Sequence, residues 1–314
     1  MAQDPKADLI TIARAQFLAQ AMRFDGPLQV LDIGANPTHR APYADLIDAR
    51  LAEVHGFEPH PQAFERLEQM KSAQQHYYNH AVGDGRAATF YQCENGSFSS
   101  LYRPSAEHFD YLGHWGKSRQ IVAEHAVQTI TLDTTPGLAA PDFVKMDVQG
   151  AEHAILKGGR RTIENTVCIM PEIRYFRLYE GEKMFGVVDN LLRDCGFMLL
   201  KILPGACLRL ASSRSERLRG TMARSQMIDA DAVYIRDLTN PDNYTARQLG
   251  CLALLADAVF DSKDLVLRCL DLMVARGVLE DSALDTYLGL LPAAYVLPAQ
   301  PAAPSKGHAA GDVV

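Results

Sequence analysis

The chain has 314 residues, of which 47% are apolar, and its formal net charge is −7 at pH 7. This length and apolar content suffice for one sizeable hydrophobic core with an appended unit. The negative charge argues against sequence-independent binding to nucleic acid, which requires neutralisation of phosphates. The sequence contains no run of roughly 18 or more apolar residues, so it predicts no transmembrane segment.

The six cysteines are scattered, without a Cys-x-x-Cys pair or a zinc-like spacing. We therefore expect reduced thiols in a cytoplasmic protein. The first residues include Asp4 and Asp8, and Arg14 interrupts the first apolar stretch, which argues against a secretory signal peptide.

Residues 7–23 place apolar side chains at helical spacing, and the turn formers at 25–27 end this predicted helix. Beyond it, apolar segments of strand length alternate with helical segments. The predicted strands lie at 28–33, 53–58, 76–82, 143–147, 167–173 and 197–203, and the predicted helices at 61–72, 151–164 and 182–195. Nearly continuous apolar strands that alternate with helices predict an α/β fold, with a parallel sheet covered by helices on both faces.

Three further regions complete the predicted organisation. Extra strands at 86–93 and 126–132 indicate an insertion between the third and fourth main strands, and 232–235 predicts a last, antiparallel strand at the sheet edge. Residues 244–292 predict two to four short helices, and the Pro-, Ala- and Gly-rich tail from Pro298 predicts disorder. The predicted units are an N-terminal helix (1–26), the main domain (27–238) with its insertion at about 86–132, a helical segment (239–297) and the tail (298–314).

Ligands of such sheets bind at the carboxyl ends of the strands, where the strand order reverses. In this sequence each of the relevant strand ends is followed by a carboxylate or a glycine. The residues are Asp32, Gly34, Ala35 and Asn36 after the first strand, Glu58 and Pro59 after the second, Val82, Gly83 and Asp84 after the third, Asp147 after the fourth, and Glu172 after the fifth.

The loop after the first strand distinguishes two classes of cofactor. The pyrophosphate of NAD requires a Gly-x-Gly-x-x-Gly loop with free amides. Here Gly34 is the only glycine of the loop, and Pro37 has no amide hydrogen to donate. A carboxylate such as Glu58 can accept hydrogen bonds from both ribose hydroxyls. Together these features favour S-adenosyl-L-methionine, whose zwitterionic end needs both acceptors and donors.

At this point the sequence resembles the FkbM-type family of S-adenosylmethionine-dependent methyltransferases, from about residue 28 to 237. The resemblance rests on "VLDIGAN", "GFEPHPQAF", "NHAVGDG", "SFSSLY", "TLDTT", "PDFVKMDVQGAEHAILKGG", "YEGEKMFGVVDNLLRDCGF" and "DAVYIRD". It implies the class I methyltransferase (Rossmann-like) fold and methyl transfer to an oxygen, often a hydroxyl of a sugar or natural product. It also assigns positions to the cofactor: Asp32, Gly34, Ala35 and Asn36 at the methionine end, Glu58 at the ribose, and Val82, Gly83 and Asp84 at the adenine. Pro37-Thr38 departs from the family pattern, in which many members have a further glycine.

Methyl transfer to a hydroxyl needs a group that removes its proton. Asp147 is the first candidate, as base or as ligand of a metal that acidifies the hydroxyl, with capping of the following helix as the structural alternative. Glu172 is a candidate for substrate anchor or second base, and Glu152 is a third candidate that a place in the first helical turn also explains. No compact cluster of metal ligands is present, so we expect no required metal.

The insertion is polar and aromatic, which suits a polyhydroxylated acceptor, although a lid packed by its own aromatic side chains is equally consistent. The candidate acceptor-binding residues are Ser99, Tyr102, His114, Trp115, Arg174 and Tyr175. Further along, five arginines crowd one stretch around Glu216. A solvated surface is the favoured interpretation, with phosphate binding as the alternative. These arginines are Arg209, Arg214, Arg217, Arg219 and Arg224.

The sequence therefore predicts a class I methyltransferase that acts on a hydroxyl of a small molecule or glycan. Three alternatives remain open: an NAD-dependent oxidoreductase or sugar epimerase, which the missing phosphate loop disfavours; a degenerate methyltransferase fold that serves as a binding module; and N-methylation of RNA or protein, for which an Asn-Pro-Pro-Tyr-type clamp is missing. The leucine-rich C-terminal helices can pack on the core or pair two subunits in a homodimer.

Overall fold

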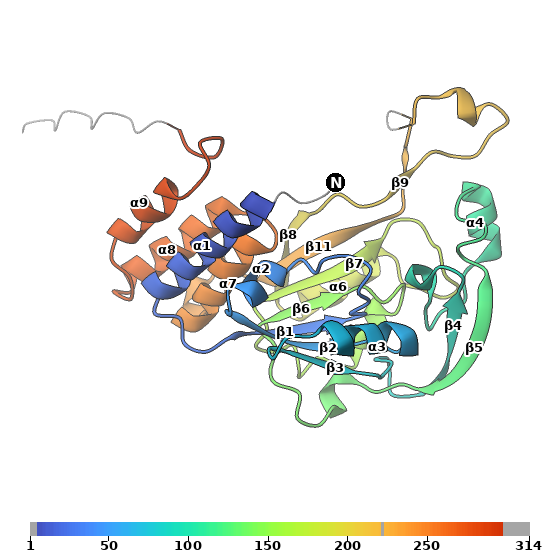
Figure 1. Cartoon of the computed structure of the whole chain (residues 1–314), viewed down its shortest axis with the longest axis horizontal. Helices are drawn as coiled ribbons and strands as arrows, with labels where there is room; N and C mark the ends of the chain where they lie inside the picture. The colour runs from blue at the N-terminus through green and yellow to red at the C-terminus, as the bar shows by residue number, and fades with distance from the viewer. Residues whose placement is uncertain (1–4, 221–222, 298–314) are drawn as a thin grey trace, which may run out of the picture.

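The computed structural model describes residues 5–220 and 223–297, and its centre is a seven-stranded sheet of order β3-β2-β1-β6-β7-β11-β8 (Figure 1). The first five strands in this order, β3, β2, β1, β6 and β7, run parallel. β11 is antiparallel to both of its neighbours, β7 and β8. The strands are β1 Leu28–Ile33, β2 Ala52–Phe57, β3 Gln75–Tyr78, β6 Phe143–Met146, β7 Cys168–Arg174, β8 Phe197–Ile202 and β11 Asp229–Arg236. This arrangement confirms the predicted α/β class with a mainly parallel sheet.

The position of the last strand differs from the prediction. β11 is antiparallel as expected, but it lies inside the sheet between β7 and β8. The strand at this edge of the sheet is therefore β8. The physical reason is burial: Ala232, Val233, Tyr234 and Ile235 are all buried, whereas most of β8 is only partly buried. A run of consecutive apolar residues is typical of an internal strand covered on both faces.

One face of the sheet is covered by the first helix together with the C-terminal helices (Figure 1). The helices are α1 Pro5–Ala21, α2 Ala44–Asp48, α7 Ala246–Ala258, α8 Lys263–Ala275 and α9 Ser282–Gly289. Leu18 of α1 and Leu252 of α7 share one buried apolar cluster with Val30 and Phe143 of the sheet. The C-terminal helices therefore pack on the main core. Of the two predicted arrangements, packing on the core and pairing of two subunits, the described residues show the first.

The opposite face is covered by α5 Glu152–Lys157 and α6 Phe185–Asp194, while α3 Pro61–Met70 follows β2. Ile155 and Leu192 bury against Ile33 and Val144 in a second apolar cluster. The helix predicted at 151–164 is wrong in length, because it ends at Lys157 and the chain continues through turns from Gly158. Glycine disfavours continuation of a helix, because its backbone loses the most conformational freedom when it is ordered.

The insertion forms a two-stranded antiparallel hairpin of β4 Ala87–Cys93 and β5 Ile121–Gln128. The strand predicted at 126–132 is displaced, because β5 pairs along the whole of β4 and ends at Gln128. A small apolar cluster around Phe109 and Tyr179 joins the insertion to the segment after β7. Shorter elements are η1 Gly96–Phe98, α4 Ala106–Leu112, η2 Leu132–Thr134, β9 Cys207–Leu208, η3 Ser215–Arg217, β10 Gln226–Met227 and η4 Pro241–Asn243.

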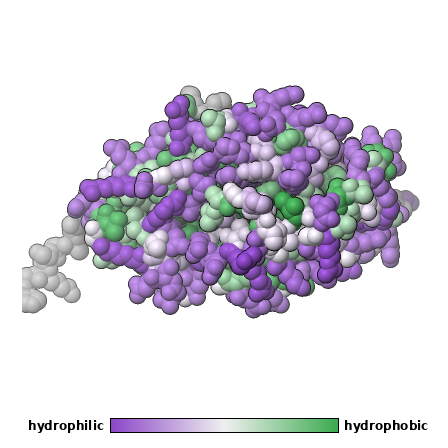
Figure 2. Space-filling model, turned by 90° about the horizontal axis from the view of Figure 1, so that it is seen from below, coloured by the Kyte–Doolittle hydropathy of each residue, from purple (hydrophilic) through white to green (hydrophobic). Residues whose placement is uncertain are grey.

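The face of the molecule shown in Figure 2 is largely hydrophilic, with apolar side chains in small separate patches. Across the described ranges, no helix combines the length and apolar character needed to cross a membrane. The tail predicted to be disordered, from Pro298 onward, lies outside the described residues.

Candidate active site

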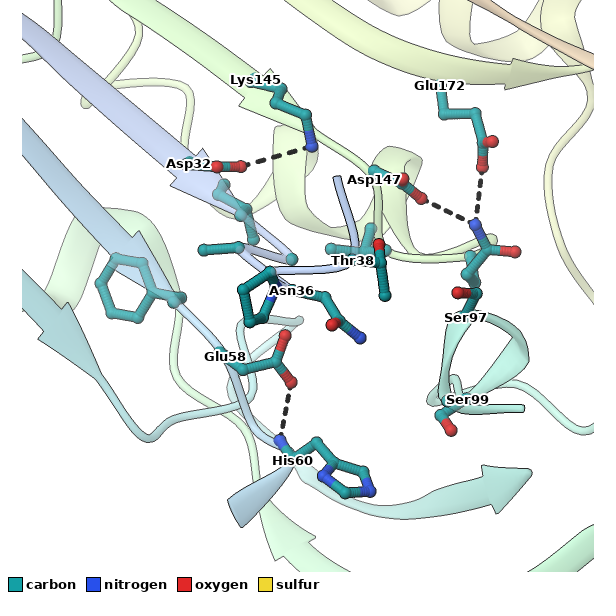
Figure 3. Close-up of a pocket in the computed structure, with 18 of the residues that line it drawn as sticks. Asp32, Asn36, Thr38, Glu58, His60, Ser97, Ser99, Lys145, Asp147 and Glu172 are labelled. Atoms are coloured by element: carbon teal, nitrogen blue, oxygen red, sulfur yellow. Dashed lines mark hydrogen bonds and ion pairs between the residues drawn. The ribbon is translucent and has the colours of Figure 1, made fainter. Parts of the chain in front are cut away.

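A cavity of about 780 Å³ opens at the carboxyl ends of the parallel strands and is bordered by the insertion. Its size lies within the usual range for sites that bind small molecules. Many of the sequence-predicted site residues meet in it, and several are shown in Figure 3. The predicted residues that line the cavity are Asp32, Gly34, Ala35, Asn36, Glu58, Pro59, Val82, Ser99, Trp115, Asp147, Glu172 and Arg174.

The loop after β1 is closed by its own hydrogen bonds. Gly34 has a φ of +85°, and a Cβ at this position would lie 2.0 Å from the backbone oxygen of Asp147, so only glycine fits. The amides of Gly34 and Ala35 both donate to the carbonyl of Phe57, at 3.0 and 3.1 Å, and the Thr38 amide donates to the carbonyl of Asn36 at 2.9 Å. With Pro37 lacking an amide hydrogen, this loop has few N–H groups left for a phosphate.

Asp32 is buried at the end of β1 and is held by two neighbours. The Tyr43 hydroxyl donates to its Oδ2 at 2.5 Å, and Lys145 Nζ lies 3.5 Å from its Oδ1 (Figure 3). Burial alone would lower the pKa of Lys145, but Asp32, Asp147 and Asp231 raise it above its ordinary value. Lys145 therefore stays charged and balances part of the negative charge of the cavity.

Asn36 and Glu58 present acceptor atoms to the same space. The Asn36 Oδ1 atom is buried and has no hydrogen-bond partner among the described residues. Glu58 is 4% exposed, and its Oε1 accepts a hydrogen bond from the His60 amide at 2.8 Å. Burial raises the pKa of Glu58 to about 7; the His60 hydrogen bond opposes this rise, while the negative charges of Asp32 and Asp147 add to it.

Gln149 connects the carboxylates at the ends of β6 and β7. Its Nε2 donates to Asp147 Oδ1 at 2.7 Å and to Glu172 Oε2 at 2.9 Å (Figure 3). Its Oε1 accepts from Arg174 at 2.7 Å and from the Tyr179 hydroxyl at 2.9 Å. The backbone φ of Gln149 is +54°, which is uncommon outside glycine, so the surrounding contacts hold this residue in an unfavourable conformation.

Arg174 is buried among carboxylates. Its guanidinium lies 2.6 Å from Glu172, 2.7 Å from Asp229 and 3.7 Å from Glu182. Burial raises the pKa of Glu172 well above its ordinary value; Arg174 opposes this rise, and Asp147 and Asp229 add to it. Arg174 thus serves as the counter-ion of the cavity floor, and its predicted contact with an acceptor remains a prediction.

Sequence reasoning missed several polar residues of the cavity. Asp229 and Asp231 of β11 pair in register with Arg174 and Glu172 of β7 and line the cavity, as does Lys145. Burial raises the pKa of Asp231 to about 6, despite the opposing charge of Lys145. The Asp-Ala-Asp alternation at the start of β11 was the available signal, since residues two apart in a strand share one face.

Six predicted residues lie outside the lining of this cavity. They are Gly83, Asp84, Tyr102, His114, Glu152 and Tyr175. Glu152 accepts hydrogen bonds from the amides of Val148 and Gly150 at 3.2 and 3.3 Å, and burial raises its pKa to about 7. Glu152 therefore holds the turn after β6. The contacts that we predict between these six residues and the cofactor or substrate remain predictions.

The described segments contain no group of three or more His, Cys, Asp or Glu side chains arranged to hold a metal ion. The aromatic side chains of the insertion mainly pack together: the rings of Phe98 and Trp115 are 5.4 Å apart, and those of Phe109 and Trp115 are 6.3 Å apart. Phe98 and Trp115 also line the cavity. The insertion is therefore packed by its own aromatic side chains and also forms a wall of the cavity, while its role as a lid remains a prediction.

The order of the sheet, with one antiparallel strand next to its edge and a cavity at the carboxyl ends, defines a class I methyltransferase fold. Residues 32–199 match the model of the methyltransferase FkbM domain, and the chain belongs to this family. The resemblance found in the sequence is thereby confirmed.

The individual relatives share less than 30% sequence identity with this chain. The chain is 27% identical over 184 residues to the 2-O-methyltransferase NoeI of Sinorhizobium fredii, a match that covers 52% of this chain and 70% of NoeI. Among solved structures, it is similar to magnesium protoporphyrin IX methyltransferase from Synechocystis PCC 6803, with 12% identity, a TM-score of 0.32 and coverage of 74% and 80% of the two chains. A putative methyltransferase from Thermoplasma acidophilum shows 9% identity, a TM-score of 0.34 and coverage of 68% and 70%.

Proposed function

We propose that this protein transfers a methyl group from S-adenosylmethionine to a hydroxyl oxygen of a neutral, polyhydroxylated acceptor such as a sugar. The observation that supports the cofactor best is the loop after β1. Its amides at Gly34, Ala35 and Thr38 are already hydrogen-bonded within the protein, and Pro37 has none. A dinucleotide needs such amides for its pyrophosphate, whereas S-adenosylmethionine has no phosphate.

The donor and acceptor groups of the cavity fit this cofactor. Under the proposal, the buried Asn36 Oδ1, which has no partner within the described chain, accepts a hydrogen bond from the ammonium group. Glu58 accepts from the ribose hydroxyls through the carboxylate oxygen that the His60 amide leaves free. Asp32 keeps the loop in place through Tyr43 and adds negative charge near the positively charged end.

The bound cofactor supplies a methyl group activated on a sulfonium. The protein must then orient the acceptor oxygen in line with that methyl group and remove its proton. Gln149 donates to Oδ1 of Asp147, which leaves Oδ2 to take the proton as the oxygen–carbon bond forms. Gln149 and Arg174 fix Glu172 beside it, as an acceptor for a second hydroxyl of the substrate.

The charge of the cavity supports a neutral acceptor. Six carboxylates line it, and of its lining cations Lys145 and Arg174 pair with these carboxylates. The other two, Arg40 and Lys71, pair with carboxylates outside the lining. An anionic acceptor would be repelled, whereas hydroxyl groups can donate to these oxygens. Trp115 offers an aromatic face of the kind that packs against sugar rings. The name 2-O-methyltransferase of the relative NoeI also supports transfer to oxygen.

The cofactor is tested by calorimetric titration of the protein with S-adenosylmethionine, S-adenosylhomocysteine and NAD. We expect binding of the two adenosyl ligands, weakened roughly 10- to 100-fold in both Glu58→Gln and Asp32→Asn. Glu58→Gln weakens the acceptor of the ribose hydroxyls, and Asp32→Asn removes negative charge near the positively charged end of the cofactor. The exposed Glu65→Gln is the matched control and should bind as the parent does. Binding of NAD alone, or of none of the three by folded protein, would refute the proposed cofactor.

The reaction is tested by transfer of a labelled methyl group to a panel of hydroxylated acceptors. Asp147→Asn should lower kcat by about 100-fold or more, because a positioned base contributes roughly that factor, and should leave cofactor affinity within a few-fold of the parent. If labelled product forms equally fast with Asp147→Asn, the base is another group of the cavity. If only amines become labelled, transfer to oxygen is wrong.

A further inference from the structure

We propose that an arginine-rich arm beside the cavity docks this protein onto an anionic phospholipid surface. The arm comprises residues 204–220 and 223–227, between β8 and β11, and is held at its base by the β9–β10 pair. It contains five arginines, one glutamate and no other charged residue, in a chain whose net charge is −7. Positive charge is therefore concentrated on one projecting segment of an otherwise acidic protein.

Most of the positive charge of the arm is not neutralised by the protein itself. Arg209 lies 3.2 Å from Glu216 and donates to the carbonyl of Leu218, while Arg214 donates to the carbonyl of its neighbour Ser213. The other three arginines form no ion pair within residues 5–220 and 223–297. These are Arg217, Arg219 and Arg224, all of them exposed. A surface of this kind attracts anions through its unpaired charges.

Apolar side chains are interleaved with these arginines. Leu210 is 37% exposed, Leu218 is 54% exposed and Met227 is 48% exposed. Leu218 stands directly between Arg217 and Arg219 in the chain. Exposed leucines flanked by arginines are typical of segments that lie in the headgroup region of an anionic membrane, where the side chains enter the boundary and the cations meet phosphates.

The composition of the arm favours a lipid surface over nucleic acid. Residues 204–227 contain no Phe, Tyr, Trp or His, so the arm has no ring on which a base could stack. Nucleic-acid binding also gains nothing from exposed leucines, whereas a bilayer interface does. Six carboxylates line the cavity and disfavour phosphate groups there, so we expect anions to be met outside it.

The arm is attached where it can bring the cavity to such a surface. Ala206 at its base lines the cavity, and the Ala206 amide donates to Asp229 Oδ1 at 2.8 Å. His114, after α4, contacts the carbonyl of Arg209 at 2.9 Å, and from there the arm extends away from the sheet (Figure 1). A docked arm would place the mouth of the cavity close to the headgroups. In that case the acceptor would be a sugar attached to a lipid. This last step rests on the proposed function.

The test is sedimentation of the full-length protein with vesicles of phosphatidylcholine alone and of phosphatidylcholine mixed with phosphatidylglycerol. We expect binding only to the mixed vesicles, and weaker binding as salt is raised. Replacing Arg214, Arg217 and Arg219 together by Gln should weaken this binding roughly 10- to 100-fold. Leu218→Ser alone should weaken it less, with the salt dependence unchanged.

A control variant makes the same change in charge elsewhere, at the exposed residues Arg160, Lys183 and Arg268, each replaced by Gln. It should bind vesicles as the parent does. Equal binding to both vesicle types, no binding to either, or an equal loss in the control and arm variants would each overturn the proposal. So would an arm that binds a mixed-sequence RNA oligonucleotide more tightly than the vesicles. Because sedimentation does not depend on methyl transfer, failure here leaves the cofactor titration untouched.

Discussion

Glu58 is a nearly buried carboxyl whose pKa is raised from the ordinary 4.5 to about 7 by burial and by the negative charges of Asp32 and Asp147. Between these values the folded protein binds more protons at this site than the unfolded chain does. The contribution of Glu58 to the free energy of unfolding is therefore full at low pH and is lost as pH rises through about 7.

Glu58→Gln removes this titration. Relative to the parent, the variant should gain about 1–3 kcal/mol of unfolding free energy between about pH 5 and about pH 8, as measured by urea denaturation. The exposed Glu65→Gln is the control and should show no such trend. A parallel pH dependence of Glu58→Gln and the parent would contradict the assignment.

Gln149 is the residue on which the geometry of the two strand-end carboxylates depends, because its amide donates to both Asp147 and Glu172. Gln149→Glu places a third carboxylate between them. We expect the free energy of unfolding to fall by about 2–4 kcal/mol near pH 8, and by less near pH 5, where the new carboxyl is protonated and can still donate. Urea denaturation at both pH values measures the difference.

The same exchange at an exposed glutamine, Gln62→Glu, is the matched control and should change stability little at either pH. A loss of equal size at both pH values for Gln149→Glu would mean that shape, rather than charge, makes Gln149 necessary.

At the scale of elements, Asp257 of α7 joins three other helical segments. It accepts from Arg14 of α1 at 3.1 Å, from Lys263 at the start of α8 at 2.9 Å and from the Tyr287 hydroxyl of α9 at 2.7 Å. Asp257→Asn leaves the buried guanidinium of Arg14 without its carboxylate and takes one of two carboxylate partners from Lys263. We expect a loss of about 3–5 kcal/mol in unfolding free energy, because an uncompensated buried charge costs that much.

The matched control is Asp261→Asn, because Asp261 is the exposed partner of the same Lys263, at 3.1 Å. It should cost about 1 kcal/mol or less, as exposed ion pairs do. Thermal or urea unfolding compares the two variants. Similar small losses in both would show that the buried charges of the helical layer are solvated in some other way.

The sequence predicted the elements unevenly, for physical reasons. Strands β1 and β6 were predicted to within a residue, because buried parallel strands are short, continuous apolar runs bounded by turn formers. The internal position of β11 was not predicted, since strand order is decided by packing between distant segments. The short α2 and α4 have too few turns to show a helical period.

The candidate site was predictable in its strand-end acids, because the carboxyl ends of parallel strands meet at one edge of the sheet. The ion pairs of Lys145 and Arg174 were not, since Lys145 is a single charge within an apolar strand and Arg174 ends a strand in which only Glu172 is also charged. Only the fold shows that Lys145 lies beside Asp32 and that Arg174 pairs in register with Asp229. Pairings of this kind depend on the alignment of strands far apart in sequence.

At the scale of the whole molecule, the first and the last helices cover the same face of the sheet. A chain truncated after Asn240 lacks α7, α8 and α9, and so exposes Val30, Phe143 and Leu18 to water. We expect this truncated chain to bind hydrophobic dyes and to unfold without a cooperative transition, because about half of its apolar cluster is gone. Near-ultraviolet circular dichroism and dye fluorescence measure this. A sharp transition with retained cofactor binding would contradict it.

The shared packing of α1 and α7 also sets an order of events during protein synthesis. About 225 residues separate the two helices, which at ribosomal rates of 5–20 residues per second corresponds to roughly 10–45 s. Throughout that interval the nascent chain displays an uncovered apolar sheet face and the unpaired guanidinium of Arg14. This makes the growing polypeptide a client for chaperones that hold apolar surfaces, until Asp257 emerges and the face is closed.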